Sequence, residues 1–280
     1  MNFVIAGAGY TGMSVIKRLP KENTTYISRT KQDHLSCDGK SIDLDNQANQ
    51  ANQINLKPPY ALLYSIPPNP EMEIDIRLPS FLNNLSPPPK RIVYMSSSGV
   101  YGNQDGKLIN ELTPLNPQTR RAKKRVAAEQ LLYNWCSKKN IKLIILRVSG
   151  IYGPNRLGLN RINKSSTIIN EDEAKSSNRI HVEDLTTCCI AALKNINASG
   201  IYNISDGDFR SNSWFIKKLC ELKNLPSPRE ITIKEAMLTW SKKRISFLKE
   251  SRRLDNRRLR DDLKIKLLYN NAEKGIKASL

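Results

Sequence analysis

Short apolar segments rich in β-branched residues alternate with longer segments of mixed polarity through the first half of the chain. Short apolar runs between amphipathic segments are typical of strands that are buried on both faces of a parallel sheet. The intervening segments predict helices, the first over residues 13–19. The pattern therefore predicts an α/β fold with a doubly wound parallel sheet. Strands are expected over residues 3–6, 25–28, 40–44, 60–66, 92–96 and 142–148.

Prolines divide this order into elements. The prolines within 67–70 close the strand that begins at residue 60, and those at 87–89 end the helix before residue 92, because proline lacks an amide donor. After Pro154 the pattern loosens. It then predicts a helix over 182–193, a strand over 200–204 and a mainly helical tail to the end of the sequence.

The chain carries a net charge of +19, which raises the question of a polyanionic partner. The densest basic stretches, residues 120–125 and 242–266, mix cations with acidic and apolar residues, as solvated helix faces do. No nucleic-acid-binding module is legible in the sequence. The interpretation therefore disfavours a nucleic-acid partner despite the charge.

The five cysteines form no CxxC pair, and two histidines cannot complete the ligand sets of a structural zinc site. We therefore expect reduced thiols, no bound metal and a cytoplasmic protein. No apolar segment approaches the ~18 residues that suggest a membrane span, and no targeting segment precedes the first strand. With 39% hydrophobic residues, the 280-residue chain is expected to fold.

A glycine-rich turn follows the first expected strand and leads into the first helix. It reads Gly7-Ala8-Gly9-Tyr10-Thr11-Gly12. In this setting the first glycine permits the tight turn, the second lets the backbone approach a pyrophosphate, and the third allows close packing of the helix. The helix N-terminus offers amide donors and a partial positive charge to the phosphates. The turn predicts a dinucleotide site.

The end of the second expected strand bears on the choice of cofactor. An acidic residue about 20 positions after the turn would bind the ribose hydroxyls of NAD. Ser28 and Arg29 stand there instead. Arg29 can grip a 2'-phosphate with a charge-assisted fork, which favours NADP over NAD. The alternative reading of Arg29 as a solvated surface residue stays open.

With these motifs in order, the chain resembles the extended short-chain dehydrogenase/reductases, which include NAD-dependent epimerases and dehydratases of nucleotide sugars. The resemblance covers roughly residues 1–205. It implies an NAD(P)-binding Rossmann domain over 1–155, completed by 180–204, and a small substrate-binding lobe from 156–179 and 205–280. The landmarks after the glycine turn are Asp43-Leu44, Ser96 to Gly102, Ala127-Ala128-Glu129, Arg147 to Pro154 and Arg179 to Asp184.

The resemblance also assigns cofactor contacts beyond the glycine turn. It implies that Asp43 lies against the adenine ring and that Ser65, Ile66 and Pro67 pass beside the cofactor. A turn-capping role for Asp43 is equally compatible with its position. Ser97 matches the catalytic Ser or Thr of the family by its spacing to Tyr101, and its hydroxyl could hydrogen-bond a substrate oxygen.

The catalytic Tyr-x-x-x-Lys of the family is missing. Counting back from Glu129 places those two positions at Arg121 and Arg125. Arg125 can still contact a ribose or phosphate, whereas Arg121 cannot act as the general acid/base because a guanidinium keeps its proton. No tyrosine occurs between Tyr101 and Tyr133, so shifting the register does not restore the pair. The chain is therefore similar to the atypical subgroup of the family.

Three other titratable side chains belong to family motifs, namely Tyr101, Tyr152 and His181. Each is interpreted as structural in preference to catalytic. The leading hypothesis is an NADP-linked oxidoreductase or epimerase-like enzyme acting on a polar small molecule such as a nucleotide sugar. The alternative is a non-catalytic NADP-binding redox sensor or scaffold. Analogy with the family suggests a homodimer through the helices around 72–85 and 126–135.

Overall fold

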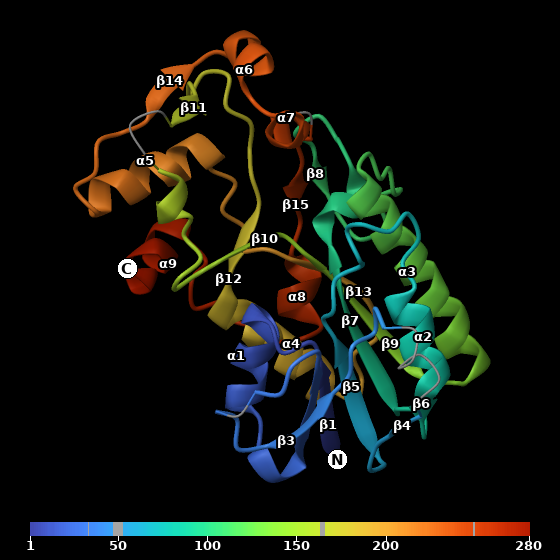
Figure 1. The fold of residues 1–280 in the computed structure, drawn as a ribbon. Coiled ribbons are helices and arrows are strands. Elements are labelled where there is room, and N and C mark those ends of the chain that lie inside the picture. The colour runs from blue at the N-terminus through green and yellow to red at the C-terminus, as the bar shows by residue number, and fades with distance from the viewer. Residues whose placement is uncertain (33, 47–52, 163–165, 249) are drawn as a thin grey trace.

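The computed structural model describes residues 1–32, 34–46, 53–162, 166–248 and 250–280. Its centre is a seven-stranded sheet of parallel strands (Figure 1), which confirms the predicted doubly wound α/β class. The strand order is β13-β9-β7-β5-β1-β2-β3. The strands span Asn2–Ala6 (β1), Thr24–Ser28 (β2), Asp38–Ser41 (β3), Tyr60–Tyr64 (β5), Arg91–Ser97 (β7), Lys142–Val148 (β9) and Gly200–Ile204 (β13).

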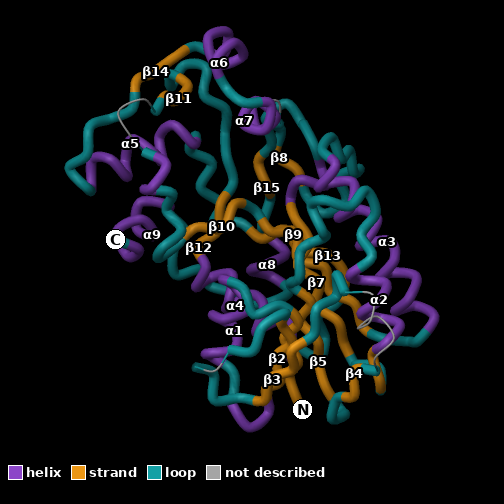
Figure 2. Tube along the Cα trace, viewed as in Figure 1, coloured by secondary structure: helices purple, strands orange, loops and turns teal. Residues whose placement is uncertain are grey.

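Helices cover both faces of this sheet (Figures 1 and 2). On one face lie α1 (Tyr10–Arg18) and α4 (Val182–Lys194), which contact each other, and on the other lie α2 (Arg77–Asn84) and α3 (Arg120–Lys138). Alternate residues of β1 serve the two layers: Ile5 joins the core under α1 and α4, and Val4 joins the core under α2 and α3. The period of two along a strand thus builds both cores.

A buried polar network ties α3 to the sheet. Arg147 Nη2 lies 2.7 Å from Glu129 Oε2, and both side chains are almost fully buried. Arg147 Nη1 also donates to the Tyr101 hydroxyl at 2.9 Å, and that hydroxyl donates to Asn203 Oδ1 at 2.8 Å. Ser96 donates its hydroxyl to Glu129. The network therefore joins β7, α3, β9 and β13 in one chain of contacts.

A smaller group of elements, most of which follow β9 in the chain, lies above the carboxyl ends of the strands (Figure 1). Tyr152, Phe215 and Ile276 are buried in its core. Short parallel pairs join β10 to β12, β11 to β14 and β15 to β8. These elements are β8 (Leu108–Ile109), β10 (Gly150–Tyr152), β11 (Thr167–Ile169), β12 (Arg179–His181), α5 (Asn212–Leu222), β14 (Arg229–Ile231), α6 (Ile233–Thr239), α7 (Lys242–Leu248), β15 (Arg253–Leu254) and α9 (Ala272–Ser279).

Most of the expected elements are present, and the differences have physical reasons. The third strand begins at Asp38 and ends before Asp43, because as the edge strand it is half exposed and needs no apolar run. Helix α1 begins at Tyr10, three residues before the apolar periodicity starts. The tail is mainly helical, yet α8 (Arg257–Asp261) returns to pack against β13 and β15 pairs with β8.

The division into a cofactor domain and a substrate lobe stays a prediction. Residues 163–165 of the expected lobe and residue 249 of the basic stretch 242–266 lie outside the described residues. Among the helices that the structure describes, none is long and apolar enough to cross a membrane.

Candidate functional site

The glycine turn has the geometry that each of its three glycines was expected to provide. Gly7 has a positive φ of 105°, which favours glycine. A Cβ on Gly12 would lie 1.8 Å from the carbonyl oxygen of Gly7, so any side chain there would break the approach of α1 to the turn. Gly9, which caps α1, has no atom within 4 Å of an added Cβ. The turn therefore has no room for a side chain at Gly12, whereas the space next to Gly9 is open.

Ser65, immediately after β5, supports this turn from behind. Its hydroxyl lies 3.0 Å from the carbonyl oxygens of both Ala6 and Gly7. Ile66 is half-buried and Pro67 is exposed at the rim. The sheet order reverses between β1 and β5, which makes these strand ends the topological switch point where ligands bind in open α/β sheets.

The neighbouring strand ends carry the residues expected to contact the adenosine half of a cofactor. Ser28 ends β2 and donates its hydroxyl to the Thr30 carbonyl, while Arg29 is exposed directly after the strand. The Asp43 carboxylate accepts the amide of Asp45 at 3.0 Å. This is the turn-capping role.

Ser97 stands at the carboxyl end of β7, on the same edge of the sheet. Its hydroxyl accepts the amide of Gly99 at 3.2 Å and caps the short helix Ser98–Tyr101. The side chain is half-buried. β7 pairs directly with β5, so Ser97 and Ser65 mark adjacent strand ends. The predicted residues at or after the ends of β1, β2, β3, β5 and β7 thus lie along one edge of the sheet.

Arg121 and Arg125 lie one turn apart on α3 but differ in their surroundings. Arg121 is exposed. Arg125 turns toward the sheet, where Nη1 donates to the Met95 carbonyl at 2.6 Å and to the Tyr94 hydroxyl at 3.0 Å. The position that carries lysine in the family is therefore anchored on β7, two residues before Ser97.

Lys124, between Arg121 and Arg125 in the sequence, makes contacts that the sequence interpretation did not predict. It is buried, and its ammonium donates to the carbonyl of Asn69 at 2.6 Å and to that of Met72. Arg77 holds the same loop through Pro67 and through an ion pair with Asp45. These contacts fix the segment after β5, which borders the glycine turn.

The three other titratable candidates are placed as structural residues. Tyr101 belongs to the buried network of Arg147, and burial raises the pKa of its hydroxyl. Burial also raises the pKa of Tyr152, whose ring packs against Gly275 of α9. His181 caps α4, accepting the Glu183 amide on Nδ1 at 3.2 Å, and Nε2 meets Ser279 Oγ at 3.0 Å. Burial lowers the pKa of His181 and keeps it neutral.

Asp206 is a second group that sequence reasoning missed. It follows β13 in a Ser-Asp-Gly segment that looks like an ordinary turn, yet its side chain is buried. One oxygen accepts the Asp208 amide at 2.9 Å, and Oδ2 has no hydrogen-bond partner among the described residues. The nearby Arg179 donates to the carbonyls of Arg210 and Ser211. Because the carboxyl group is buried, the pKa of Asp206 is raised from 3.8 to about 7.

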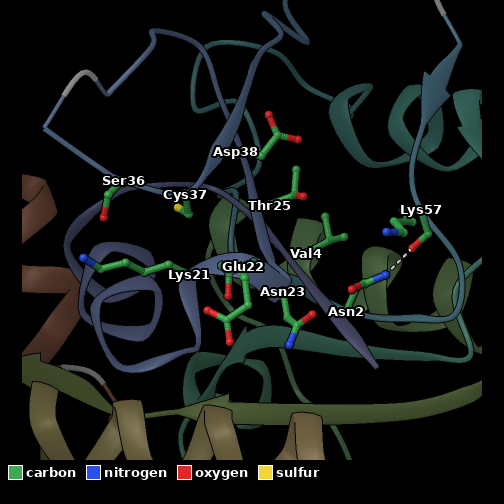
Figure 3. A pocket seen from close by; sticks show the side chains of 11 residues that line it. Asn2, Val4, Lys21, Glu22, Asn23, Thr25, Ser36, Cys37, Asp38 and Lys57 are labelled. Carbon is green, nitrogen blue, oxygen red and sulfur yellow. Dashed lines mark hydrogen bonds between the residues drawn. The ribbon is translucent and has the colours of Figure 1, made fainter.

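A cavity of about 550 Å³ lies at the amino ends of the strands, at the end of the sheet away from the glycine turn (Figure 3). Asn2 of β1, Thr25 of β2 and Asp38 of β3 line it, at or near the amino ends of their strands, together with Lys21 and Cys37. None of the expected cofactor or catalytic residues borders it. Since ligands of doubly wound sheets bind at the carboxyl ends, this cavity is not the candidate site.

Comparison with known proteins supports the resemblance seen in the sequence. Residues 72–205 match the model of the NAD dependent epimerase/dehydratase family. Human dTDP-D-glucose 4,6-dehydratase is 23% identical over 141 residues, which cover 48% of this chain and 40% of that protein. The chain thus spans less than half the length of this curated relative.

Solved structures share the fold over the whole chain. A conserved protein of unknown function from Silicibacter pomeroyi superposes with a TM-score of 0.81 and 24% identity, covering 99% of this chain and 97% of that chain. dTDP-glucose 4,6-dehydratase from Bacillus anthracis, in complex with NAD, superposes with a TM-score of 0.74 and 14% identity, covering 100% and 95%. At these identities the likeness establishes the fold.

The environment of Asp206 predicts an unusual pH dependence of stability. A carboxyl group whose folded pKa is about 7 and whose ordinary value is 3.8 binds more protons in the folded state between these values. Its stabilising contribution is therefore lost as the pH rises from about 4 to about 7. Asp206→Asn keeps the acceptor for the Asp208 amide, and we expect it to be more stable than the wild type by roughly 2–4 kcal/mol at pH 8 and by only about 1–2 kcal/mol at pH 5, where the unfolded carboxyl is already ionised.

Thermal unfolding of both proteins at pH 5.0, 6.5 and 8.0 measures this difference. Any contribution of His181 is common to both and cancels. Asp208→Asn is the matched control, because Arg210 and backbone amides hold the pKa of Asp208 low, at about 2. That variant should lose stability without a pH trend over the same range. A constant difference between wild type and Asp206→Asn would contradict the placement of Asp206.

Proposed function

We propose that this chain, whose residues 72–205 match the model of the NAD dependent epimerase/dehydratase family, binds NADP(H) and acts on a polar, anionic small molecule such as a nucleotide sugar. The observation that carries the proposal is the glycine turn. Gly7 and Gly12 pack closely against each other in the turn. The open space next to Gly9 adjoins the first amides of α1. A diphosphate fits such a turn by size and by charge.

Arg29 supports NADP over NAD. It follows β2, the strand next to β1, and its exposed side chain can reach a group bound at the glycine turn. A 2'-phosphate would gain charge-assisted hydrogen bonds there, and no carboxylate occupies the equivalent position. The Bacillus anthracis enzyme, 14% identical to this chain, was solved in complex with NAD. The proposed preference for NADP rests on Arg29 alone.

The reaction site is built from Ser97, Arg121 and Arg125. Ser97 can donate a hydrogen bond to a reacting oxygen, since its own contact with Gly99 uses it as an acceptor. Arg125, anchored on β7, can present its cation to the sugar or phosphate of the cofactor. Arg121 supplies a permanent charge for an anionic substrate group. NADP, when bound, would supply hydride transfer.

A nucleotide sugar suits these residues as a substrate class. The human relative is named as a dTDP-D-glucose dehydratase, so its substrate carries a sugar on a diphosphate. A site with two arginines in place of Tyr and Lys gains affinity for a diphosphate or carboxylate and loses its usual proton donor. The enzyme therefore needs a different acid or base.

A non-catalytic role is the competing proposal, and the arginine at position 121 is the observation that favours it. A guanidinium does not transfer protons at working pH. A protein that keeps the cofactor turn and has lost the acid/base could report cofactor occupancy as a redox sensor or scaffold. Possible homodimer formation through α2 and α3 stays an analogy with the family in either case.

The first prediction concerns cofactor choice. NADP should bind more tightly than NAD, and Arg29→Ala should weaken NADP about 10- to 100-fold while leaving NAD nearly unchanged, because only the 2'-phosphate contacts Arg29. Isothermal titration calorimetry measures both affinities. Arg18→Ala is a matched control, since Arg18 pairs with Glu183 on the far end of α1. An unchanged preference in Arg29→Ala would remove the assignment.

The second prediction tests the turn itself. Gly9→Val should fold normally, because φ at Gly9 is −81° and no atom lies within 4 Å of a Cβ, yet the branched side chain would fill the diphosphate space. NADP at 100 times its Kd should raise the wild-type Tm by roughly 5–10 °C and leave the variant unshifted. Gly12→Val, by contrast, should lower the Tm without ligand. A normal ligand shift in Gly9→Val would place the cofactor elsewhere.

The third prediction separates enzyme from binding protein. NADPH oxidation is screened against carbonyl compounds and nucleotide sugars, with wild type, Ser97→Ala and Arg121→Ala. If the chain is an enzyme, each substitution should reduce turnover by ~10²-fold or more, the range for losing a positioned group. Turnover that survives both substitutions would refute this site. Ligand binding without any turnover in the wild type would favour the sensor or scaffold.

A further inference from the structure

Arg156 is a cation beside the glycine turn that neither the sequence interpretation nor the proposed site uses. It lies on the segment that follows β10, far from α1 in sequence, and its side chain is exposed. Its guanidinium carbon is 5.2 Å from the centroid of the Tyr10 ring. Tyr10 is the first residue of α1. A cation–π contact thus holds the charge of Arg156 at the start of this helix.

The backbone around Arg156 is fixed to the same tyrosine. The Tyr10 hydroxyl donates to the Pro154 carbonyl at 2.9 Å. Gly153 has a φ of 149°, and a Cβ there would lie 2.7 Å from the Tyr10 hydroxyl oxygen, so the close approach requires glycine. The Arg156 amide then donates to the Gly153 carbonyl at 2.9 Å, closing a turn. These contacts make residues 153–156 a strap across the start of α1.

The charge balance at this position favours an anion. The first turn of α1 contains no acidic residue, and the capping Gly9 offers no side-chain oxygen to the helix amides. No ion pair of Arg156 with a carboxylate is present among the described residues. The guanidinium and the partial positive charge of the helix therefore stand side by side without an internal counterion.

We infer that Arg156 clamps the diphosphate of a ligand bound on the glycine turn, from the side opposite the helix amides. The inference rests on the proposed function and adds a residue from the strap to that site. A guanidinium can move over the Tyr10 ring and form a two-pronged contact with phosphate oxygens. Adenosine, which lacks phosphates, would make no use of it.

The strap also connects the turn to the smaller group of elements. Leu157 and Leu159, which follow Arg156 directly, pack against the core that contains Tyr152 and Phe215. An ion pair between Arg156 and a diphosphate would therefore hold this core against the glycine turn. The binding of the diphosphate is expected to protect residues 153–162 from exchange with solvent.

The test compares ADP, inorganic pyrophosphate and adenosine as probes by calorimetry. Arg156→Met, which keeps an apolar chain over Tyr10, should weaken ADP and pyrophosphate about 10-fold and change adenosine less than twofold. Arg156→Lys should retain most of the affinity for ADP, because it retains the charge. Arg244→Met is the matched control: Arg244 also stacks on an aromatic ring, 3.4 Å from the Trp240 centroid, but on α7 at the far end of the molecule (Figure 1).

The outcomes separate the two proposals. If the wild type binds NADP and ADP, and Arg156→Met binds ADP equally well with an unchanged dependence on salt, the clamp is refuted and the cofactor site stands. If the wild type binds neither NADP nor ADP, the proposed function itself fails. A loss of ADP affinity in Arg156→Met with normal thermal stability, and no loss in Arg244→Met, establishes the clamp.

Discussion

The buried ion pair between Glu129 and Arg147 is the interaction on which the geometry of the site depends. Removing one partner of such a pair leaves an uncompensated charge, at a cost of about 3–5 kcal/mol. Here the pair also joins α3 to β9, and its extensions reach Ser96 on β7 and Tyr101 in the turn after Ser97. The Ser97 hydroxyl and the α3 arginines are therefore positioned by one buried framework. A small rotation of α3 would cost hydrogen bonds at both ends.

The glycine turn shows how far local sequence can predict a site. Gly7 and Gly12 have the backbone geometry that their spacing predicted, Gly7 by its positive φ and Gly12 by its close approach to the Gly7 carbonyl. The role of Gly9 toward a pyrophosphate stays a prediction. The doubly wound parallel sheet was equally predictable, since apolar runs separated by helices are typical of strands buried on both faces. The edge strand β3 was less so, because exposure removes the apolar signal.

The contacts of α3 and the burial of Asp206 could not be predicted from the sequence. Five cations occur within residues 120–125. Composition cannot tell that Lys124 is buried and donates to the Asn69 carbonyl. That depends on the loop after β5, which is distant in sequence. Asp206 looks like a turn residue in the sequence, yet its side chain is buried and its amide donates to the Arg179 carbonyl of β12.

Part of the large positive charge of the chain lies on arginine side chains that donate hydrogen bonds to its own backbone carbonyl oxygens. Arg91 donates to the Ala192 carbonyl at the C-terminal end of α4, where the helix dipole favours a cation. Arg179 caps the carbonyls of Arg210 and Ser211, and Arg252 donates to Gly102. Arg91 and Arg179 form no ion pair with a carboxylate among the described residues, so they raise the net charge of the chain.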